Sequence, residues 1–247
     1  MTKLLPSRSK GEIMIRYGQY CPIAKALELL AERWTLLLVR ELLMGSRRFN
    51  DLRRGVPLMA PSVMSQRLKA LTDSGIVVRE PGPEGRSYEY RVTAAGEELR
   101  PLILQLGTWG QRWSRSKMNA DDLDASFLMW DIRRNLHLDK LPDERVVINF
   151  EFPDAKKGMK QWWLVVEGGE VDLCLDDPGL EVDITLSTSL RTMTQVWMGD
   201  ISLGQARAKG LLKVFGAARP VRGLSSWLGA SPFAHVAPAM AKVAATV

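Results

Sequence analysis

The chain has 247 residues, of which 46% are hydrophobic and 25% are charged, a composition that excludes a disordered or fibrous protein and allows one or two globular domains. Its formal charge of +6 is concentrated in residues 1–118, which hold 20 Lys or Arg against 11 Asp or Glu, whereas residues 119–247 hold 14 against 17. Concentrated positive charge favours a polyanionic partner such as nucleic acid, although a solvated basic face that binds nothing has the same composition.

The two cysteines, Cys21 and Cys174, are too far apart in the sequence to indicate a disulfide framework or a cysteine metal site. No apolar stretch follows a basic N-terminal region, and no apolar run is long enough for a membrane helix. The two histidines, His137 and His235, lack metal-ligand spacing, and no serine lies in a nucleophile motif. We therefore expect a cytoplasmic protein without a membrane span, metal, cofactor or catalytic site.

The first half of the chain predicts four helices, then a β-hairpin, then a long helix. Pro22 and Pro61 suit first helical positions, and the second helix is apolar enough to be buried nearly all round. A turn rich in Gly and Pro separates two strands, and Thr93 is placed to cap the last helix. The expected helices cover residues 22–30, 32–43, 49–54, 61–74 and 93–116, and the expected strands cover residues 76–80 and 87–92.

This order of elements is that of a winged helix-turn-helix domain, in which residues 61–74 would be the recognition helix. Such a helix needs an apolar face to dock on its domain and a polar face for the edges of the bases. Met64, Leu68 and Leu71 fall on one helical stripe. The opposite face carries Ser62, Ser65, Gln66 and Lys69. The alternative is an amphipathic helix whose polar face is merely solvated.

Other polar side chains suit contacts with the bases and phosphates of a DNA duplex. Gln66 has the geometry for two hydrogen bonds to adenine, and Ser62 lies where a helix N-terminus favours a phosphate. Arginines surround the short helix at residues 49–54, and Arg86 lies at the tip of the hairpin. The predicted DNA-binding residues are Arg47, Arg48, Asn50, Arg53, Ser62, Ser65, Gln66, Lys69 and Arg86.

Motifs spread over about residues 16–115 resemble those of bacterial HxlR-type regulators. In chain order they are residues 21–23, 29–30, 32–42, 47–52, 64–71, 75–77, 90–96 and 106–110. The resemblance implies a homodimer on a palindromic operator, held by the N-terminal segment and the helix after the wing. The dimer residues it implies on that helix are Leu102, Leu106, Trp109 and Trp113. Ala60 replaces the polar cap that is frequent in the family and Ser62 a frequent basic residue, so the operator sequence is not carried over.

Cys21 has two interpretations. Arg16 and Lys25 lie close in the sequence, and positive charge favours a reactive thiolate. Some HxlR-type proteins use a cysteine at this place as a redox or electrophile sensor. The simpler interpretation, which we favour, is a small half-buried side chain packed beside Pro22.

From Asn119 the chain changes to an acidic linker and then to alternating helices and strands. Gly168-Gly169 between two apolar strands predicts a tight hairpin. The expected helices cover residues 127–136, 190–198, 203–209 and 219–228, and the expected strands cover residues 146–152, 162–167, 170–175, 182–186 and 211–215. The resulting domains are a winged helix-turn-helix for DNA binding and dimerisation at 1–118, a linker at 119–126, an α+β domain at 127–230 and an Ala-rich tail at 231–247.

Residues 197–206 and 210–216 resemble part of sterol carrier protein-like domains. The predicted fold class is therefore α+β, with a winged helix-turn-helix followed by a sterol carrier-like domain. In such domains a sheet and its helices enclose an apolar tunnel for a lipid-like molecule. The side chains that would line it are Trp130, Trp162, Trp163, Met193, Trp197 and Phe215. Each of these could equally be an ordinary core residue.

Three functions are compatible with these observations. The first is a homodimeric transcriptional regulator that binds double-stranded DNA and responds to a small apolar ligand. The second is the same regulator with a purely structural second domain. The third is a lipid-binding protein whose first domain mainly dimerises.

Overall fold

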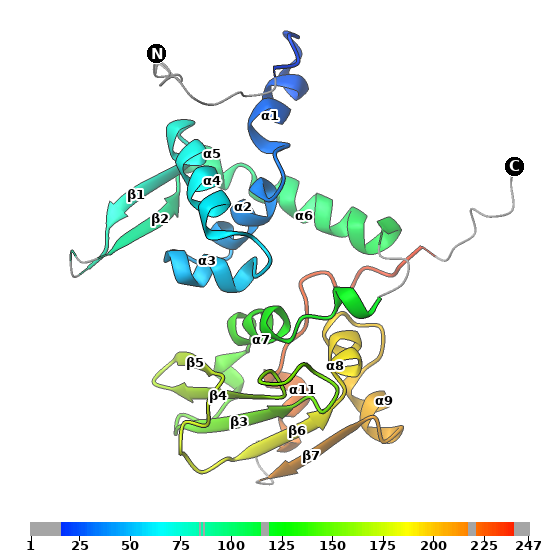
Figure 1. Cartoon of the computed structure of the whole chain (residues 1–247). Coiled ribbons are helices and arrows are strands. Elements are labelled where there is room, and N and C mark those ends of the chain that lie inside the picture. Colours follow the sequence, from blue (N-terminus) through cyan, green and yellow to red (C-terminus); the bar gives the residue numbers. More distant parts are fainter. Residues whose placement is uncertain (1–15, 84, 86, 115–118, 217–220, 240–247) are drawn as a thin grey trace, which may run out of the picture. The chain divides into compact units, whose positions relative to one another are not determined.

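The computed structural model describes residues 16–83, 85, 87–114, 119–216 and 221–239. The chain divides into two compact units, Met1–Leu106 and Gly107–Val247 (Figure 1). In the described ranges, no helix combines the length and the apolar character of a membrane span.

The first unit contains the predicted sequence of helices and a hairpin. In chain order its elements are α1 (Pro22–Leu30), α2 (Thr35–Leu43), α3 (Phe49–Gly55), α4 (Pro61–Asp73), β1 (Val77–Pro81), β2 (Tyr88–Val92) and α5 (Ala94–Glu97), and α6 (Arg100–Trp109) begins in this unit. The two strands pair antiparallel, with Val77 opposite Val92. The winged helix-turn-helix arrangement expected for the first half of the chain is thereby confirmed.

One apolar core holds these elements together. Met64, Leu68 and Leu71 of α4 are at most 2% exposed, as the helical stripe predicts, and pack with Leu38 of α2 and Leu52 of α3. Full burial of a Leu or Met side chain contributes roughly 1.5–3 kcal/mol each. The loop between α2 and α3 also joins the hairpin, because the Tyr90 amide donates to the Arg47 carbonyl over 2.8 Å.

Helix α2 begins three residues later than expected and is not buried all round. Trp34, which precedes it, has a φ of 78°, a left-handed conformation that an α-helix cannot continue through. Glu32 and Arg33 therefore belong to the turn before α2. Leu37 is 41% exposed, so one side of the helix faces away from the core.

The continuous helix expected over residues 93–116 was a wrong prediction. It is interrupted after α5, restarts as α6, and ends in a π-helical turn, η1 (Gly110–Ser114). Pro101 explains the interruption, because it has no N–H to donate and its ring would clash with the Glu97 carbonyl in a continuous helix. At the second position of α6 that donor is not needed. The expected cap is confirmed, since Thr93 Oγ1 accepts from the Gly96 amide.

The second unit is an α+β domain built on one mixed sheet. Its strands are β3 (Val146–Glu151), β4 (Gln161–Glu167), β5 (Glu170–Cys174), β6 (Ile184–Thr188) and β7 (Leu212–Gly216). Their order across the sheet is β5-β4-β3-β6-β7, and β3 and β6 are parallel while the other neighbours are antiparallel. Gly168 and Gly169 have φ values of 59° and 80°, as expected for the tight turn between β4 and β5.

Helices pack on one face of this sheet. They are α7 (Ala125–Arg134), α8 (Leu190–Trp197) and α11 (Leu224–Trp227), and α9 (Leu203–Ala208) follows α8 in the chain. The core between them contains Ile148, Phe150 and Ile184 from the strands, with Met193 and Trp227 from the helices. The last helix is shorter than expected, and residues 217–220 lie outside the described ranges. Of the Ala-rich tail, residues 231–239 are described, and Val236 is buried.

Candidate nucleic-acid interface

Helix α4 presents the polar face that its sequence predicts. Pro61 occupies its first position, and the spacing of Met64, Leu68 and Leu71 turns one side toward the core. The side chains on the other face, Ser62, Ser65, Gln66 and Lys69, are all exposed. Ser65 Oγ donates to the Pro61 carbonyl over 3.0 Å, and Lys69 forms an ion pair with Asp73. This face therefore combines hydroxyl, amide and ammonium groups, the donors that read base edges and phosphates.

A second contact, which the sequence analysis missed, fixes the position of α4. Arg67 Nη2 lies 2.8 Å from Glu32 Oε2, and Arg67 Nε donates to the Arg33 carbonyl over 3.4 Å. The Arg67 side chain is only 19% exposed, so this arginine anchors α4 to the turn before α2 rather than joining the polar face. The position of Arg67 between the polar and apolar faces of the helix was the sequence signal that could have predicted this contact.

Basic residues around α3 extend the exposed polar surface. Arg53 is exposed, and Arg54 Nη1 lies 3.7 Å from Asp51 Oδ1. Arg48 Nε lies 3.6 Å from Glu89 Oε1, with the Arg48 side chain 63% exposed. The Arg54–Asp51 pair is largely exposed and contributes about 0–1 kcal/mol, so a phosphate group can replace its carboxylate partner at little cost, whereas Glu89 in the Arg48 pair is buried. The other predicted residues of this segment, Arg47 and Asn50, are also exposed.

The described part of the wing adds two arginines that were not predicted. The guanidinium of Arg79 lies 3.5 Å from the centroid of the Tyr88 ring, and both residues are exposed. Arg91 lies 3.2 Å from carboxylate oxygens of Glu80 and Glu89. The predicted wing-tip contact, Arg86, lies outside the described residues. Alternation along β1 could not have placed Arg79 on the surface, because it puts Arg79 on the same face as the buried Val77. The charge of the side chain was the available signal.

An ion pair on α2, with a completely buried carboxylate, contacts the end of α3. Glu41 on α2 is completely buried, and its Oε1 atom lies 2.8 Å from Arg40 Nη2. The same Arg40 nitrogen donates to the Gly55 carbonyl at the end of α3 over 2.9 Å. A Cβ atom on Gly55 would lie 1.9 Å from Glu41 Oε2, so only glycine allows this approach. Charge and backbone shape thus join α2 to the helix that carries Arg53 and Arg54.

Large apolar side chains remain exposed on three helices of the first unit. Ile23 of α1 is 70% exposed, and Leu37 of α2 is 41% exposed. On α6, Leu102, Leu104 and Leu106 are each 43–47% exposed. The two other residues implied for a dimer, Trp109 and Trp113, belong to the second unit and are also exposed. Contiguous exposed apolar side chains mark interaction surfaces, and Leu102 and Leu106, four positions apart, lie on the same side of α6.

Cys21 precedes the first residue of α1 and is half-buried, without a disulfide partner. Lys25 Nζ lies 3.0 Å from Glu28 Oε1, so the nearest lysine already has a carboxylate partner. This hydrogen bond from Lys25 lowers the pKa of the Glu28 carboxyl below its ordinary value.

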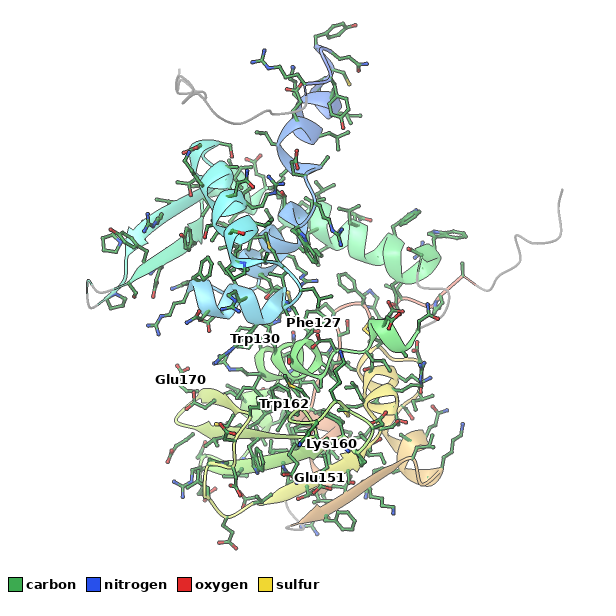
Figure 2. The ribbon with its side chains drawn as sticks, viewed as in Figure 1. Phe127, Trp130, Glu151, Lys160, Trp162 and Glu170 are labelled. Carbon is green, nitrogen blue, oxygen red and sulfur yellow. The ribbon has the colours of Figure 1, made fainter. Side chains whose placement is uncertain are left out.

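The structure does not bring the six predicted ligand-pocket residues together. Trp162 and Trp163 are neighbours in β4 and therefore point to opposite faces of the sheet. Trp162, Met193 and Trp197 pack in the core, whereas Phe215 is 57% exposed, because β7 turns Leu212 and Val214 toward the core instead. Trp130 is buried beside the Arg133 guanidinium, and Figure 2 labels it on α7 with Trp162 below on the sheet. The prediction that these six residues line one shared pocket is therefore wrong.

Comparison with known proteins finds similarity in the first half of the chain. The model of the HxlR-like helix-turn-helix family matches residues 29–118. The uncharacterized HTH-type transcriptional regulator YvaP of Bacillus subtilis is 35% identical over 113 residues, which are 45% of this chain and 96% of YvaP. The uncharacterized HTH-type transcriptional regulator Mb3122 of Mycobacterium bovis is 40% identical over 92 residues, and this chain spans only 58% of its length.

Among solved structures, the reduced form of the transcriptional regulator YodB from Bacillus subtilis is similar to 38% of this chain. The match covers 93% of the YodB chain at 28% identity, with a TM-score of 0.34.

Proposed function

Because this chain belongs to the HxlR-like helix-turn-helix family, we propose that it is a sequence-specific DNA-binding transcriptional regulator. The observation that carries the proposal is the exposed polar face of α4, whose opposite face is locked into the core by Met64, Leu68 and Leu71. The arginines beside α3 and on the wing supply phosphate contacts on the same unit. In this proposal α4 enters the major groove, and Arg47, Arg48, Asn50 and Arg53 bind the flanking backbone.

A homodimer on a palindromic operator is the second part of the proposal. Two copies of α4 related by a two-fold axis would contact two half-sites of one duplex, about one helical turn apart. The exposed apolar residues of α1 and α6 support this, because Ile23, Leu102 and Leu106 would be covered in a dimer. Trp109 and Trp113, further along the same helical segment, would extend the contact.

The second unit is proposed to be a sterol carrier-like domain that binds a small apolar effector. The five-stranded sheet with helices on one face supports this assignment, since such domains enclose their ligand between sheet and helices. A ligand there can alter DNA binding only if it binds the DNA-bound and free forms with different affinity.

A gel-shift titration of the protein with its own promoter tests the DNA-binding proposal directly. We expect a discrete complex that competitor DNA of random sequence displaces poorly. Absence of affinity for any duplex at low ionic strength would refute the proposal and favour the lipid-binding alternative, because phosphate contacts are strongest there.

Replacing Gln66 by alanine is expected to relax base preference at one position of each half-site. Gln66 is exposed on the polar face of α4, and a two-point hydrogen bond to adenine contributes about 1–3 kcal/mol of discrimination. Binding to a set of single-base operator variants measures this change. Gln161→Ala, on β4 of the second unit, is the matched control and should leave the preference unchanged. Equal weakening on every sequence would exclude Gln66 as a base-reading residue.

Replacing Arg53 by alanine is expected to weaken binding to all sequences alike. The physical reason is the loss of one phosphate contact, which lowers the slope of log K against log salt by about one per DNA-bound subunit. Titrations at several salt concentrations give this slope. The control is Arg145→Ala, which removes an exposed arginine of the second unit. The slope of log K against log salt for this variant should equal that of the unaltered protein. An unchanged slope for Arg53→Ala would remove this residue from the phosphate contacts.

A further inference from the structure

A cavity in the second unit shares Trp197, and none of the other five residues, with the set first proposed for ligand binding. Its volume is about 390 Å³, within the range of small-molecule sites. The apolar part of its wall consists of Phe127 and Leu128 from α7 and of Trp197 and Met198 at the end of α8. Phe127 is labelled on α7 in Figure 2. Two aromatic rings, a thioether and a leucine suit a ligand with an apolar body.

The polar part of the wall is acidic. Asp122, Asp124 and Asp131 line the cavity, and no Lys, Arg or His does so among the described residues. Asp131 is already engaged, because it lies 2.6 Å from Arg134 Nη2 and accepts from Trp197 Nε1 over 2.8 Å. The ion pair with Arg134 balances its charge.

The two other carboxylates are held in place by the backbone. Asp124 Oδ1 accepts from the Phe127 amide over 2.9 Å, and Asp122 Oδ2 accepts from the Asn119 amide over 2.8 Å. Within the described parts of the chain, neither carboxylate has a Lys or Arg at ion-pair distance. The described part of the wall therefore carries negative charge beside aromatic side chains, which disfavours a fatty acid or another anion there.

Thr194 of α8 also lines the cavity, and the rest of the wall comes from the helical segment that follows α6. Gly110 and Ser114 line the cavity, and they are the first and last residues of the π-helical turn η1. This segment is fixed within the second unit, because the Arg112 carbonyl accepts from the Ala239 amide over 2.7 Å and Gly107 packs closely against Phe233. π-Helical turns are rare and are often found at functional sites.

We propose that this cavity binds an organic cation with an aromatic or apolar body. The cation would lie near Asp122 and Asp124, the ring of Phe127 would stabilise it by cation–π attraction, and Met198 would add apolar contact. The proposal rests on the proposed function in one respect, which is that the cation would be the effector of the regulator. Because η1 lines the cavity, a bound cation would contact the helical segment that continues from α6, the helix proposed to form the dimer.

Calorimetric titration of the full-length protein with tetraphenylphosphonium and with tetraphenylborate tests the charge preference. The two ions have nearly the same shape and opposite charge, so a difference in affinity reports the charge of the site. We expect tetraphenylphosphonium to bind at least tenfold more tightly. Equal binding of both ions, or tighter binding of the borate, would overturn the proposal.

Two variants locate the binding. Asp122→Asn combined with Asp124→Asn should weaken tetraphenylphosphonium binding at least tenfold, while the side-chain carbonyl introduced at position 124 can still accept from the Phe127 amide. Asp122→Asn alone changes a solvent-exposed side chain and should weaken binding severalfold even if the double variant folds poorly. Asp172→Asn, an exposed carboxylate on β5, is the control and should bind like the unaltered protein. Unchanged binding by both Asp122 variants would exclude this cavity.

A gel shift without any added ion separates the two proposals. Loss of DNA binding together with selective tetraphenylphosphonium binding would refute the regulator and leave the cation site standing. DNA binding without selective cation binding would overturn the cation site and leave the regulator proposal standing.

Discussion

Replacing Leu106 by aspartate is expected to convert the proposed dimer into a monomer and to weaken operator binding by roughly a hundredfold or more. Leu106 lies on α6 with 45% of its surface exposed, beside the equally exposed Leu102. In a dimer its burial would exclude water from both copies, and an aspartate at the same place would bury an unpaired charge. A monomer binds only one half-site, so it loses the gain in effective concentration that links the two recognition helices.

Sedimentation velocity and gel shift on the same preparation measure both effects. Gln105→Asp is the matched control, because it adds the same charge to the neighbouring exposed position of α6. We expect this control to remain dimeric and to bind the operator. A Leu106→Asp protein that stays dimeric, or unaltered protein that is monomeric at operator-binding concentrations, would contradict the proposed dimer.

Replacing Glu41 by alanine is expected to lower the free energy of unfolding of the first unit by about 3–5 kcal/mol. Glu41 is completely buried, and its partner Arg40 has a side chain that is only 22% exposed. The substitution removes the carboxylate that Arg40 faces and leaves a cavity beside Gly55. The loss should also loosen α3, because Arg40 joins α2 to the Gly55 carbonyl.

A second Glu–Arg pair in the same unit provides the control. Glu97 Oε2 and Arg100 Nη2 are also 2.8 Å apart, but both side chains are nearly half exposed. Because water solvates both partners, Glu97→Ala should cost less than about 1 kcal/mol. Urea unfolding followed by circular dichroism compares the two variants through their midpoints. Similar midpoints for Glu41→Ala and the unaltered protein would show that the buried pair does not hold α2 to α3.

Much of the first unit could be predicted because its elements depend on nearby residues. The apolar stripe of α4, the proline at its start and the cap at Thr93 are signals within one or two turns of helix. The break before α6 was also local, since Pro101 alone explains it, and it was missed because apolar periodicity was given more weight than the missing N–H.

The exposed polar residues of α4 were accessible to sequence reasoning for the same reason. Their exposure follows from helical periodicity once the buried stripe is known. The cavity in the second unit was not accessible, because α8 lies far along the chain from η1 and α7, which form the rest of its wall together with the segment between them. Residue type alone had suggested a tryptophan-lined pocket, but two of these tryptophans, Trp162 and Trp163, lie on opposite faces of one strand.

The amino-acid sequence by itself determined the kinds of element, their order, the basic character of the first half and which face of α4 is exposed and polar. These depend on residue type and on spacing over a few positions. Only the tertiary structure decided which distant residues meet: Glu41 with Gly55, Arg67 with Glu32, and Asp131 with Trp197, which are 66 positions apart. Periodicity carries no information about such pairs, because they depend on how separate elements pack against one another.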